Sequence, residues 1–200
     1  MKTEVVLFDL GGVLVGLGGI EDFGRMIGEG EESEIWRRWL SSPSVRLYER
    51  GLCDRATFAA DMVKENDLDI SAEDFLEIFR AWPRGLFPGA EELVTQLPPE
   101  IRTGCLSNTN ELHWNEQQDA ERIQALFQRS FLSHEMNLVK PDREIFAAVL
   151  AELGCDAKAV LFLDDNQINI EGARALEIDA ECANGIEGAR AVLKARRLLG

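Results

Sequence analysis

Alternation of apolar, strand-like runs with helical runs is the feature that most constrains the fold of this chain. The run "TEVVLF" (3–8) predicts a first strand, and from about residue 84 onward further strand-like runs alternate with helical ones. These runs are "IRTGCLS" (101–107), "SFLS" (130–133), "AVLFLDD" (159–165) and "IDAECA" (178–183). Strands that alternate with helices form a parallel sheet covered on both faces. The sequence therefore predicts an α/β core.

A helical segment interrupts this pattern between the first strand and the rest. In "SAEDFLEIFRAW" (71–82), Ser71 and Asp74 fit a capping box, and apolar residues then recur at helical spacing. We find no convincing strand in this segment, and "PRGLFPG" (83–89) reads as a breaker that ends it. We therefore expect a core made of residues 1–17 and 84–200, with an inserted all-helical cap, residues 18–83. An insert at this point lies over the carboxyl ends of the strands, where open α/β sheets bind ligands.

Charge and composition exclude some classes of partner. The 200-residue chain is 46% hydrophobic and carries a formal net charge of -15. A polyanionic surface disfavours nucleic acid and acidic membranes, so we expect neither as a partner, whereas a local site can still take a small anion. The four cysteines match no zinc pattern and favour a reducing compartment, and the apolar start is too short for a signal peptide. The expected location is the cytoplasm, and the oligomeric state stays open.

Four polar groups follow the predicted strands and should meet at one edge of the sheet. They are Asp9, the run Ser107-Asn108-Thr109-Asn110, Lys140 and the pair Asp164-Asp165. Turn formation or helix capping explains each group alone, most easily the Ser-Asn-Thr-Asn run. Two adjacent carboxylates at the end of a buried strand are harder to explain, because they cost desolvation and mutual repulsion unless a cation compensates.

The residue types indicate metal-assisted phosphate chemistry. Three carboxylates with no matching histidine cluster favour a hard, oxygen-binding cation, hence Mg²⁺ rather than zinc. A hydroxyl, an amide and an ammonium can hold phosphate oxygens. With its neighbours screened by metal and lysine, Asp9 can act as a nucleophile and form an aspartyl-phosphate, which water then hydrolyses.

At this point the sequence resembles the haloacid dehalogenase-like hydrolase superfamily over nearly its whole length. Four motifs occur in the family's order and spacing: "FDLGGVL", "LSNTN", "VKPDREIF" and "LFLDDNQINIEGA". Each is weak alone, but the ordered set is specific. The resemblance is greatest to the branch that holds sugar-1-phosphate phosphatases. It implies a Rossmann-like parallel sheet core with helices on both faces, a helical cap, a Mg²⁺ cofactor and a small phosphate ester as substrate.

The resemblance also implies roles for individual residues. Asp9 would be the nucleophile and a Mg²⁺ ligand, and Lys140 would orient both the nucleophile and the phosphate. The other implied roles are metal ligation by the Gly11 carbonyl and Asp165, support of the metal site by Asp164 and Asn169, and phosphate binding by Ser107 and Asn108. Asn137 fills a position that is often glycine in the family, and asparagine tolerates the left-handed conformation.

Gly11 departs from most phosphatases of this family. There an aspartate protonates the leaving oxygen and later activates water, and general acid–base catalysis of this kind contributes ~10²–10⁴-fold. Glycine supplies neither function, although the sugar-phosphatase branch also has glycine here. His113 could replace the missing acid and base, but a helix-surface or capping role explains it more simply. Trp114 is more simply explained as a packing residue. We also leave Tyr48 and Glu49, at the end of a cap helix, out of the catalytic residues.

Three functions remain in competition. The first is a Mg²⁺-dependent phosphatase that acts on a small phosphorylated metabolite. The second is a 2-haloacid dehalogenase, in which Asp9 attacks carbon without a metal, although such relatives have tyrosine at the Gly11 position. The third is a catalytically weak family member that binds a ligand or partner, and Gly11 is its main support.

Overall fold

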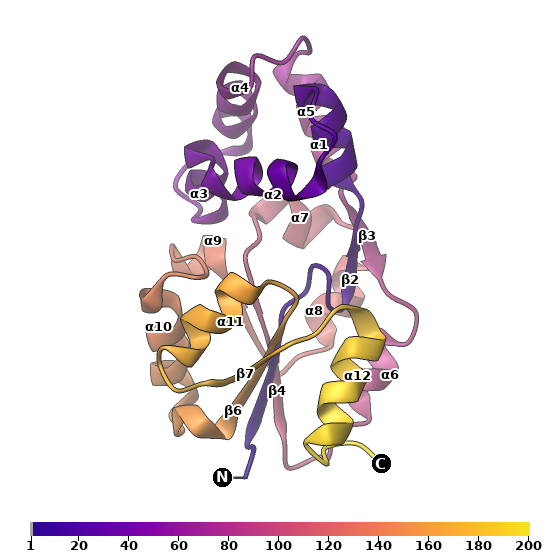
Figure 1. Cartoon of the computed structure of the whole chain (residues 1–200), viewed down its shortest axis with the longest axis vertical. Helices are drawn as coiled ribbons and strands as arrows, with labels where there is room; N and C mark the ends of the chain where they lie inside the picture. The colour runs from indigo at the N-terminus through magenta and orange to yellow at the C-terminus, as the bar shows by residue number, and fades with distance from the viewer. Residues whose placement is uncertain (1) are drawn as a thin grey trace.

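The computed structural model describes residues 2–200, and its centre is a parallel sheet of five strands (Figure 1). The strands lie in the order β5-β4-β1-β6-β7, and every neighbouring pair is parallel. Their bounds are β1 Val5–Phe8, β4 Arg102–Ser107, β5 Arg129–Leu132, β6 Val160–Asp164 and β7 Asp179–Cys182. The predicted α/β fold with a Rossmann-like sheet is therefore confirmed.

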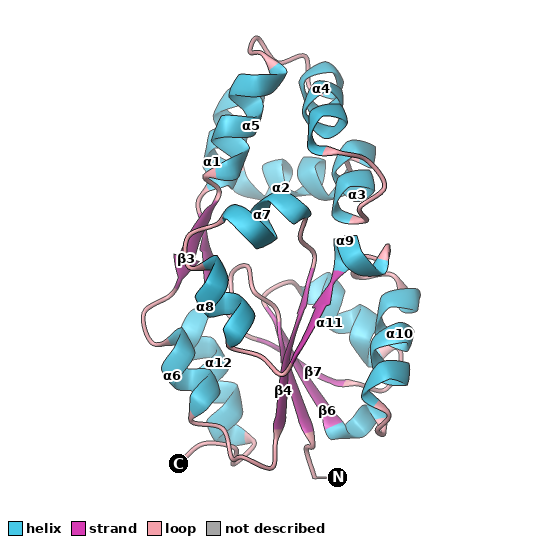
Figure 2. Cartoon of the chain, turned by 180° about the vertical axis from the view of Figure 1, so that it is seen from behind, coloured by secondary structure: helices cyan, strands magenta, loops and turns pink. Residues whose placement is uncertain are grey.

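Helices cover both faces of this sheet (Figure 2). One face packs against α10 (Arg143–Leu153) and α11 (Gln167–Arg174), and the other against α6 (Ala90–Thr95) and α12 (Gly185–Ala195). The alternation of side chains along β1 explains the two layers, because Val5 and Leu7 face the first pair of helices and Val6 and Phe8 face the second. The strand is apolar throughout because both of its faces are buried.

A bundle of five helices lies beyond the carboxyl ends of the strands (Figure 1). We call this bundle the cap. Its helices are α1 Gly19–Ile27, α2 Glu32–Ser41, α3 Pro43–Glu49, α4 Arg55–Glu65 and α5 Ala72–Arg80. They surround an aromatic cluster in which Phe79 contacts the rings of Trp39, Phe58 and Trp82. The cap thus has apolar packing of its own.

Shorter helices join the cap to the sheet. Two of them, α7 (Glu111–Glu116) and α9 (Ser133–Met136), follow β4 and β5 directly and lie beneath the cap in both views. The remaining short elements are α8 (Ala120–Ala125) and the 3-10 helix η1 (Ala157–Ala159). Because α7 and α9 continue from strand ends, they bring the cap close to the carboxyl edge of the sheet.

A two-stranded antiparallel sheet connects cap and core, and the sequence did not predict it. Its strands are β2 (Val15–Leu17) and β3 (Pro83–Leu86). The "PRGLFPG" segment, which contains β3, was expected to be a breaker and not a strand. The pairing is close at Gly16, where a Cβ would lie 3.3 Å from both Arg84 and Phe87. A glycine in a strand can thus mark close backbone packing rather than a turn.

Candidate active site

Asp9, Lys140 and Asp164 form a buried ion-pair cluster at the carboxyl edge of the sheet. The Lys140 Nζ lies 3.0 Å from Asp9 Oδ1 and 2.7 Å from Asp164 Oδ2. It also donates to the Leu106 carbonyl at 3.0 Å. Asp164 ends β6, and Asp9 directly follows β1, so neighbouring parallel strands deliver both carboxylates to one place. The expected convergence of strand-end residues is observed.

Burial and charge together set the protonation of this cluster. Burial raises the pKa of Asp9 to about 8, Lys140 opposes this rise, and the nearby charges of Asp164 and Asp165 add to it. Burial opposes the charge on Lys140, but the two carboxylates outweigh it and raise the pKa of the ammonium. Burial also raises the pKa of Asp165 to about 6, and the charge of Asp164 adds to the rise. The site therefore carries excess negative charge that a cation would offset.

The carboxylates suit a hard divalent cation. Oxygens of Asp9, Asp164 and Asp165 lie within 4.8 Å of one another. Both oxygens of Asp164 are already occupied, since Lys140 and Asn169 bind them and the Asn166 backbone N–H donates to Oδ1 at 2.8 Å. The Lys140 ammonium and the Leu10 backbone N–H both donate to Asp9 Oδ1, which leaves Oδ2 for other partners. Asp9 and Asp165 are thus the acids open to an oxygen-binding cation such as Mg²⁺.

Gly12 creates the space for Asp165. Its φ is +71°, and a Cβ at this position would lie 2.0 Å from Asp165 Oδ2. Only glycine combines this conformation with so close an approach. No role was predicted for Gly12 from the sequence, and the signal that could have indicated one is the second glycine of the "DLGG" run.

Asn108 positions Lys140. Its Oδ1 accepts from the Lys140 backbone N–H at 2.8 Å, and its Nδ2 donates to the Lys140 carbonyl at 3.0 Å. Ser107, at the end of β4, is buried. Asn169 lies beside Asp164, with Nδ2 3.1 Å from each carboxylate oxygen. The predicted phosphate-binding pair thus lies next to the lysine, and Asn169 lies where support for the acids was expected.

Residues that sequence reasoning kept out of the site have structural partners. His113 Nε2 lies 2.8 Å from the Phe79 carbonyl, and burial lowers the pKa of the ring to about 4. Trp114 is buried in a small apolar cluster. Asn137 has a φ of 58° and ends α9, which confirms the expected left-handed conformation.

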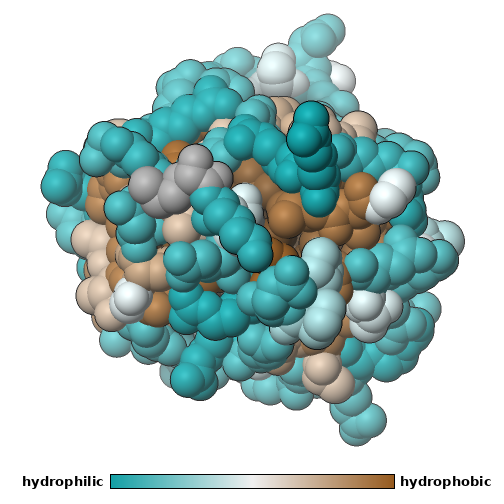
Figure 3. Space-filling view, turned by 90° about the horizontal axis from the view of Figure 1, so that it is seen from below, coloured by the Kyte–Doolittle hydropathy of each residue, from teal (hydrophilic) through white to brown (hydrophobic). Residues whose placement is uncertain are grey.

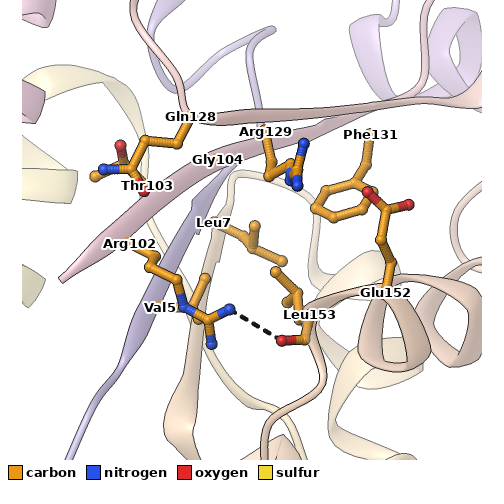
Figure 4. Close-up of a pocket in the computed structure, with 10 residues that line it drawn as sticks. All are labelled: Val5, Leu7, Arg102, Thr103, Gly104, Gln128, Arg129, Phe131, Glu152 and Leu153. Carbon is orange, nitrogen blue, oxygen red and sulfur yellow. Dashed lines mark hydrogen bonds between the residues drawn. The ribbon is translucent and has the colours of Figure 1, made fainter.

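A cavity at the opposite end of the sheet is separate from these groups. Its volume is about 370 Å³, and it lies beside the amino ends of β4 and β5 (Figure 4). Arg102 reaches across its mouth and donates to the Leu153 carbonyl at 2.9 Å, while Arg129 and Glu152 lie nearby. None of the predicted site residues lines this cavity. Seen from this end, the surface mixes hydrophobic residues with a hydrophilic surround (Figure 3).

The family model for haloacid dehalogenase-like hydrolases matches residues 3–177. The chain belongs to this family. It is therefore a hydrolase, and the family resemblance of the sequence motifs is confirmed. No helix among residues 2–200 has the length and apolar character needed to cross a membrane.

Solved structures of this family resemble the chain over most of its length. A haloacid dehalogenase (HAD) family enzyme of Bacteroides thetaiotaomicron, in complex with magnesium and inorganic phosphate, is 26% identical with a TM-score of 0.72. The match covers 92% of this chain and 95% of that enzyme. A predicted HAD-like hydrolase of Porphyromonas gingivalis is 21% identical with a TM-score of 0.79, covering 98% and 99% of the two chains.

The fold is also shared with a dehalogenase. The L-2-haloacid dehalogenase of Xanthobacter autotrophicus is 19% identical, with a TM-score of 0.64 and coverage of 91% of this chain and 78% of that enzyme. At this identity the likeness concerns the fold alone. An enzyme with bound magnesium and phosphate and a haloacid dehalogenase thus share this fold, so the reaction has to be argued from the site.

Proposed function

We propose that this protein is a Mg²⁺-dependent phosphatase that hydrolyses a small phosphorylated metabolite, such as a sugar phosphate, through an aspartyl-phosphate on Asp9. The observation that carries the proposal is the acidic trio Asp9, Asp164 and Asp165 beside the buried Lys140. A carboxylate that attacks carbon, as in a dehalogenase, needs no second carboxylate that is free to bind a metal. Asp165 is such a carboxylate, so its presence favours the phosphatase. The magnesium and phosphate in the Bacteroides enzyme support the same reading.

The residues suit the roles that the reaction requires. Asp9, the Gly11 carbonyl and Asp165 would hold Mg²⁺, which when bound offsets the negative charge of the acids and of the phosphoryl oxygens. Lys140 contributes a permanent positive charge for the phosphoryl group and orients Asp9. Asp164 and Asn169 keep Lys140 and the acids in place.

Substrate binding would use the edge next to the nucleophile. Ser107 and Asn108 would contact the phosphoryl oxygens, and Lys140 would attract them. Asp9 Oδ2 attacks phosphorus, the ester oxygen leaves with its bonding electrons, and water then cleaves the acyl phosphate and regenerates the carboxylate. We also propose that residues 18–83 form a cap domain over a core of residues 1–17 and 84–200, and that the cap contributes to substrate choice. The four free cysteines are consistent with the cytoplasm as the location.

The test is phosphate release from a panel of phosphate esters with and without EDTA. We expect Mg²⁺-dependent release that Asp9→Asn abolishes while the circular dichroism spectrum stays unchanged. Full activity of a folded Asp9→Asn protein would contradict the mechanism. Halide release from 2-haloacids that EDTA leaves unchanged would identify a dehalogenase, and Mg²⁺-dependent binding of sugar phosphates without turnover of any ester would identify a binding protein.

A further inference from the structure

Cleavage of an alkyl phosphate ester requires a proton source that the catalytic edge lacks. The leaving oxygen of an alkyl ester departs with an electron pair and needs a proton, which general acid catalysis supplies. Gly11 has no side chain to provide it. A Cβ at Gly11 would lie 2.8 Å from Leu17 Cδ1, so this leucine occupies the adjacent space. The question rests on the proposed phosphatase function.

The charged groups of the edge are committed to other tasks. Lys140 donates to Asp9, Asp164 and Leu106, and the neighbouring carboxylates raise the pKa of its ammonium, which makes it a poor acid. Asp164 is engaged through both oxygens. Asp9 and Asp165 are assigned to the nucleophile and the metal.

Neither histidine fits the task. His113 is held by the Phe79 carbonyl and the Asn110 side chain, and burial keeps its ring neutral. His134 is half-buried on α9, and burial lowers its pKa, with Glu135 and Glu111 as the charges that act on it. Neither Asp9, Asp164 nor Lys140 is among the charges that act on His134, so this histidine is not coupled to the catalytic edge. The proton must therefore come from another element.

Glu49, the last residue of α3, brings an acid from the cap close enough to this edge for the charge of Lys140 to act on it. It is half-buried, and the ammonium of Lys140 is the foremost opposing charge that acts on it. The carboxylate has no ion pair or hydrogen bond among the described residues. An unpaired acid in this position is costly to bury unless it has a function.

The contacts on either side of Glu49 fix α3 against the core (Figure 1). Arg46 binds Asp142 at 2.7 Å, and Arg50 donates to the Asn137 carbonyl at 3.0 Å. Asn137 Nδ2 donates back to the Arg50 carbonyl at 2.8 Å. The two arginines nearest to Glu49, one within α3 and one directly after it, thus bind the segment that leads into and follows Lys140. They hold the end of α3 beside this segment, and neither of them pairs with the Glu49 carboxylate.

The surroundings of Glu49 also suit proton transfer near neutral pH. Burial raises the pKa of its carboxyl group to about 7, while Lys140 and Arg46 oppose the rise. Helix α3 packs against α2 and α4 of the cap and against α9, which carries His134 and Glu135. The charged groups that act on Glu49 are Lys140 and Arg46, and Arg46 is paired with Asp142. An acid with its pKa near the working pH can both donate and recover a proton.

We propose that Glu49 is the general acid and base of the reaction and performs the function that Gly11 lacks. As Asp9 Oδ2 bonds to phosphorus, the bond from phosphorus to the ester oxygen breaks, and that oxygen takes the proton of the Glu49 carboxyl group. The Glu49 carboxylate then removes a proton from water as the water oxygen bonds to phosphorus. Inorganic phosphate leaves, the Asp9 carboxylate is restored, and Glu49 is protonated again.

The test compares leaving groups in the first turnover of Glu49→Gln, a substitution of similar shape. The substrates are p-nitrophenyl phosphate, whose nitrophenolate leaves without a proton, and glycerol 2-phosphate, whose alkoxide needs one. By rapid quench with Mg²⁺ we expect alcohol release from glycerol 2-phosphate to fall by ~10²–10⁴-fold. The nitrophenolate burst should persist at about wild-type rate, followed by slow turnover, because the phosphorylated enzyme then lacks its base.

The control variant is Glu73→Gln, which removes an exposed acid of α5 in the same cap and should behave as wild type on both substrates. Equal losses in the first turnover of both substrates would overturn the inference, since they indicate a structural effect. Unchanged release from glycerol 2-phosphate would overturn it as well. In both cases wild-type activity that depends on Mg²⁺ and Asp9 leaves the phosphatase proposal intact, whereas a wild type without such activity removes both proposals.

Discussion

At the scale of single residues, Lys140 is held by the protein before any substrate arrives. Its ammonium contacts Asp9, Asp164 and the Leu106 carbonyl, and both of its backbone polar groups bind Asn108. The side chain is almost fully buried. The conformational entropy of a long flexible side chain is therefore lost on folding and not on substrate binding. Lys140 acts through its charge and position rather than as a proton donor.

Gly12 offers a test of the metal site at the same scale. Gly12→Ala places a methyl group against Asp165 Oδ2 and puts a non-glycine residue at a φ of +71°. We expect Asp165 to be displaced and Mg²⁺ affinity, measured by calorimetry, to fall at least about tenfold, as loss of support for a ligand typically does. Gly28→Ala is the matched control, because Gly28 has a φ of +68° and open space around it. Equal Mg²⁺ affinity of the two variants would contradict the role of Gly12.

The residue scale also shows where prediction from sequence succeeds. Asp9, Lys140 and Asp164 were predicted to meet because each lies at or beyond the carboxyl end of a predicted strand of one parallel sheet, a rule that depends only on topology. Glu49 was left out of the catalytic residues because it comes from a cap helix with no motif of its own. Its position depends on the contacts of Arg46 and Arg50 with the core, which no local pattern reveals.

At the scale of elements, α7 links the sheet to the cap. It begins after Asn110, whose side chain accepts from the His113 backbone N–H. Arg55 at the start of α4 binds both Glu111 and Glu116 of α7, and Arg80 of α5 binds Glu116. These ion pairs are partly exposed, so each contributes little alone. Their main effect is to fix where the cap helices sit over α7.

His113 of α7 predicts a pH dependence of stability. Its pKa is about 4 in the folded protein against an ordinary 6.5, so the unfolded chain binds the proton more readily between these values. The stabilisation is therefore complete above pH 6.5 and is lost as the pH falls toward 4, by about 3 kcal/mol at most. Glutamine at this position does not titrate, so His113→Gln should lose less stability than the wild type as the pH falls. Urea unfolding of both proteins at pH 7 and pH 4.5 measures the difference, and equal losses would falsify this assignment.

The small sheet of β2 and β3 shows the limit of sequence patterns at this scale. Strands of three and four residues containing Gly16, Pro83 and Gly85 offer no apolar alternation to detect. They pair because the chain leaves the core and returns to it at the same place, with the Gly18 N–H donating to the Trp82 carbonyl at 3.0 Å. The five strands of the core, by contrast, were all predicted from their sequence pattern.

At the scale of the whole molecule, cap and core share an apolar contact. Leu112 of α7 is fully buried and belongs to the aromatic cluster of the cap. We expect Leu112→Ala to cost about 2–5 kcal/mol in the free energy of unfolding. Because the lost contact joins the two parts, the cap should then unfold at lower denaturant concentration than the core.

Fluorescence and circular dichroism can separate these events. Three of the four tryptophans, Trp36, Trp39 and Trp82, belong to or pack against the cap cluster. In Leu112→Ala, the fluorescence transition should precede the far-ultraviolet transition. Leu93→Ala, in the cluster between α6 and the sheet, should lower stability without putting the fluorescence transition first. Coincident transitions in Leu112→Ala would show that this contact does not couple the two parts.

The way positive and negative charges are divided between cap and core has a consequence for protein engineering. Arginines on the cap meet acids on the core at every ionic link described above, from Arg46 with Asp142 to Arg80 with Glu116. A chimera that receives a foreign insert in place of residues 18–83 would keep the acids and lose their arginines. Grafting α7 together with the insert would preserve the matched surfaces, so the transferable module is longer than the inserted segment itself.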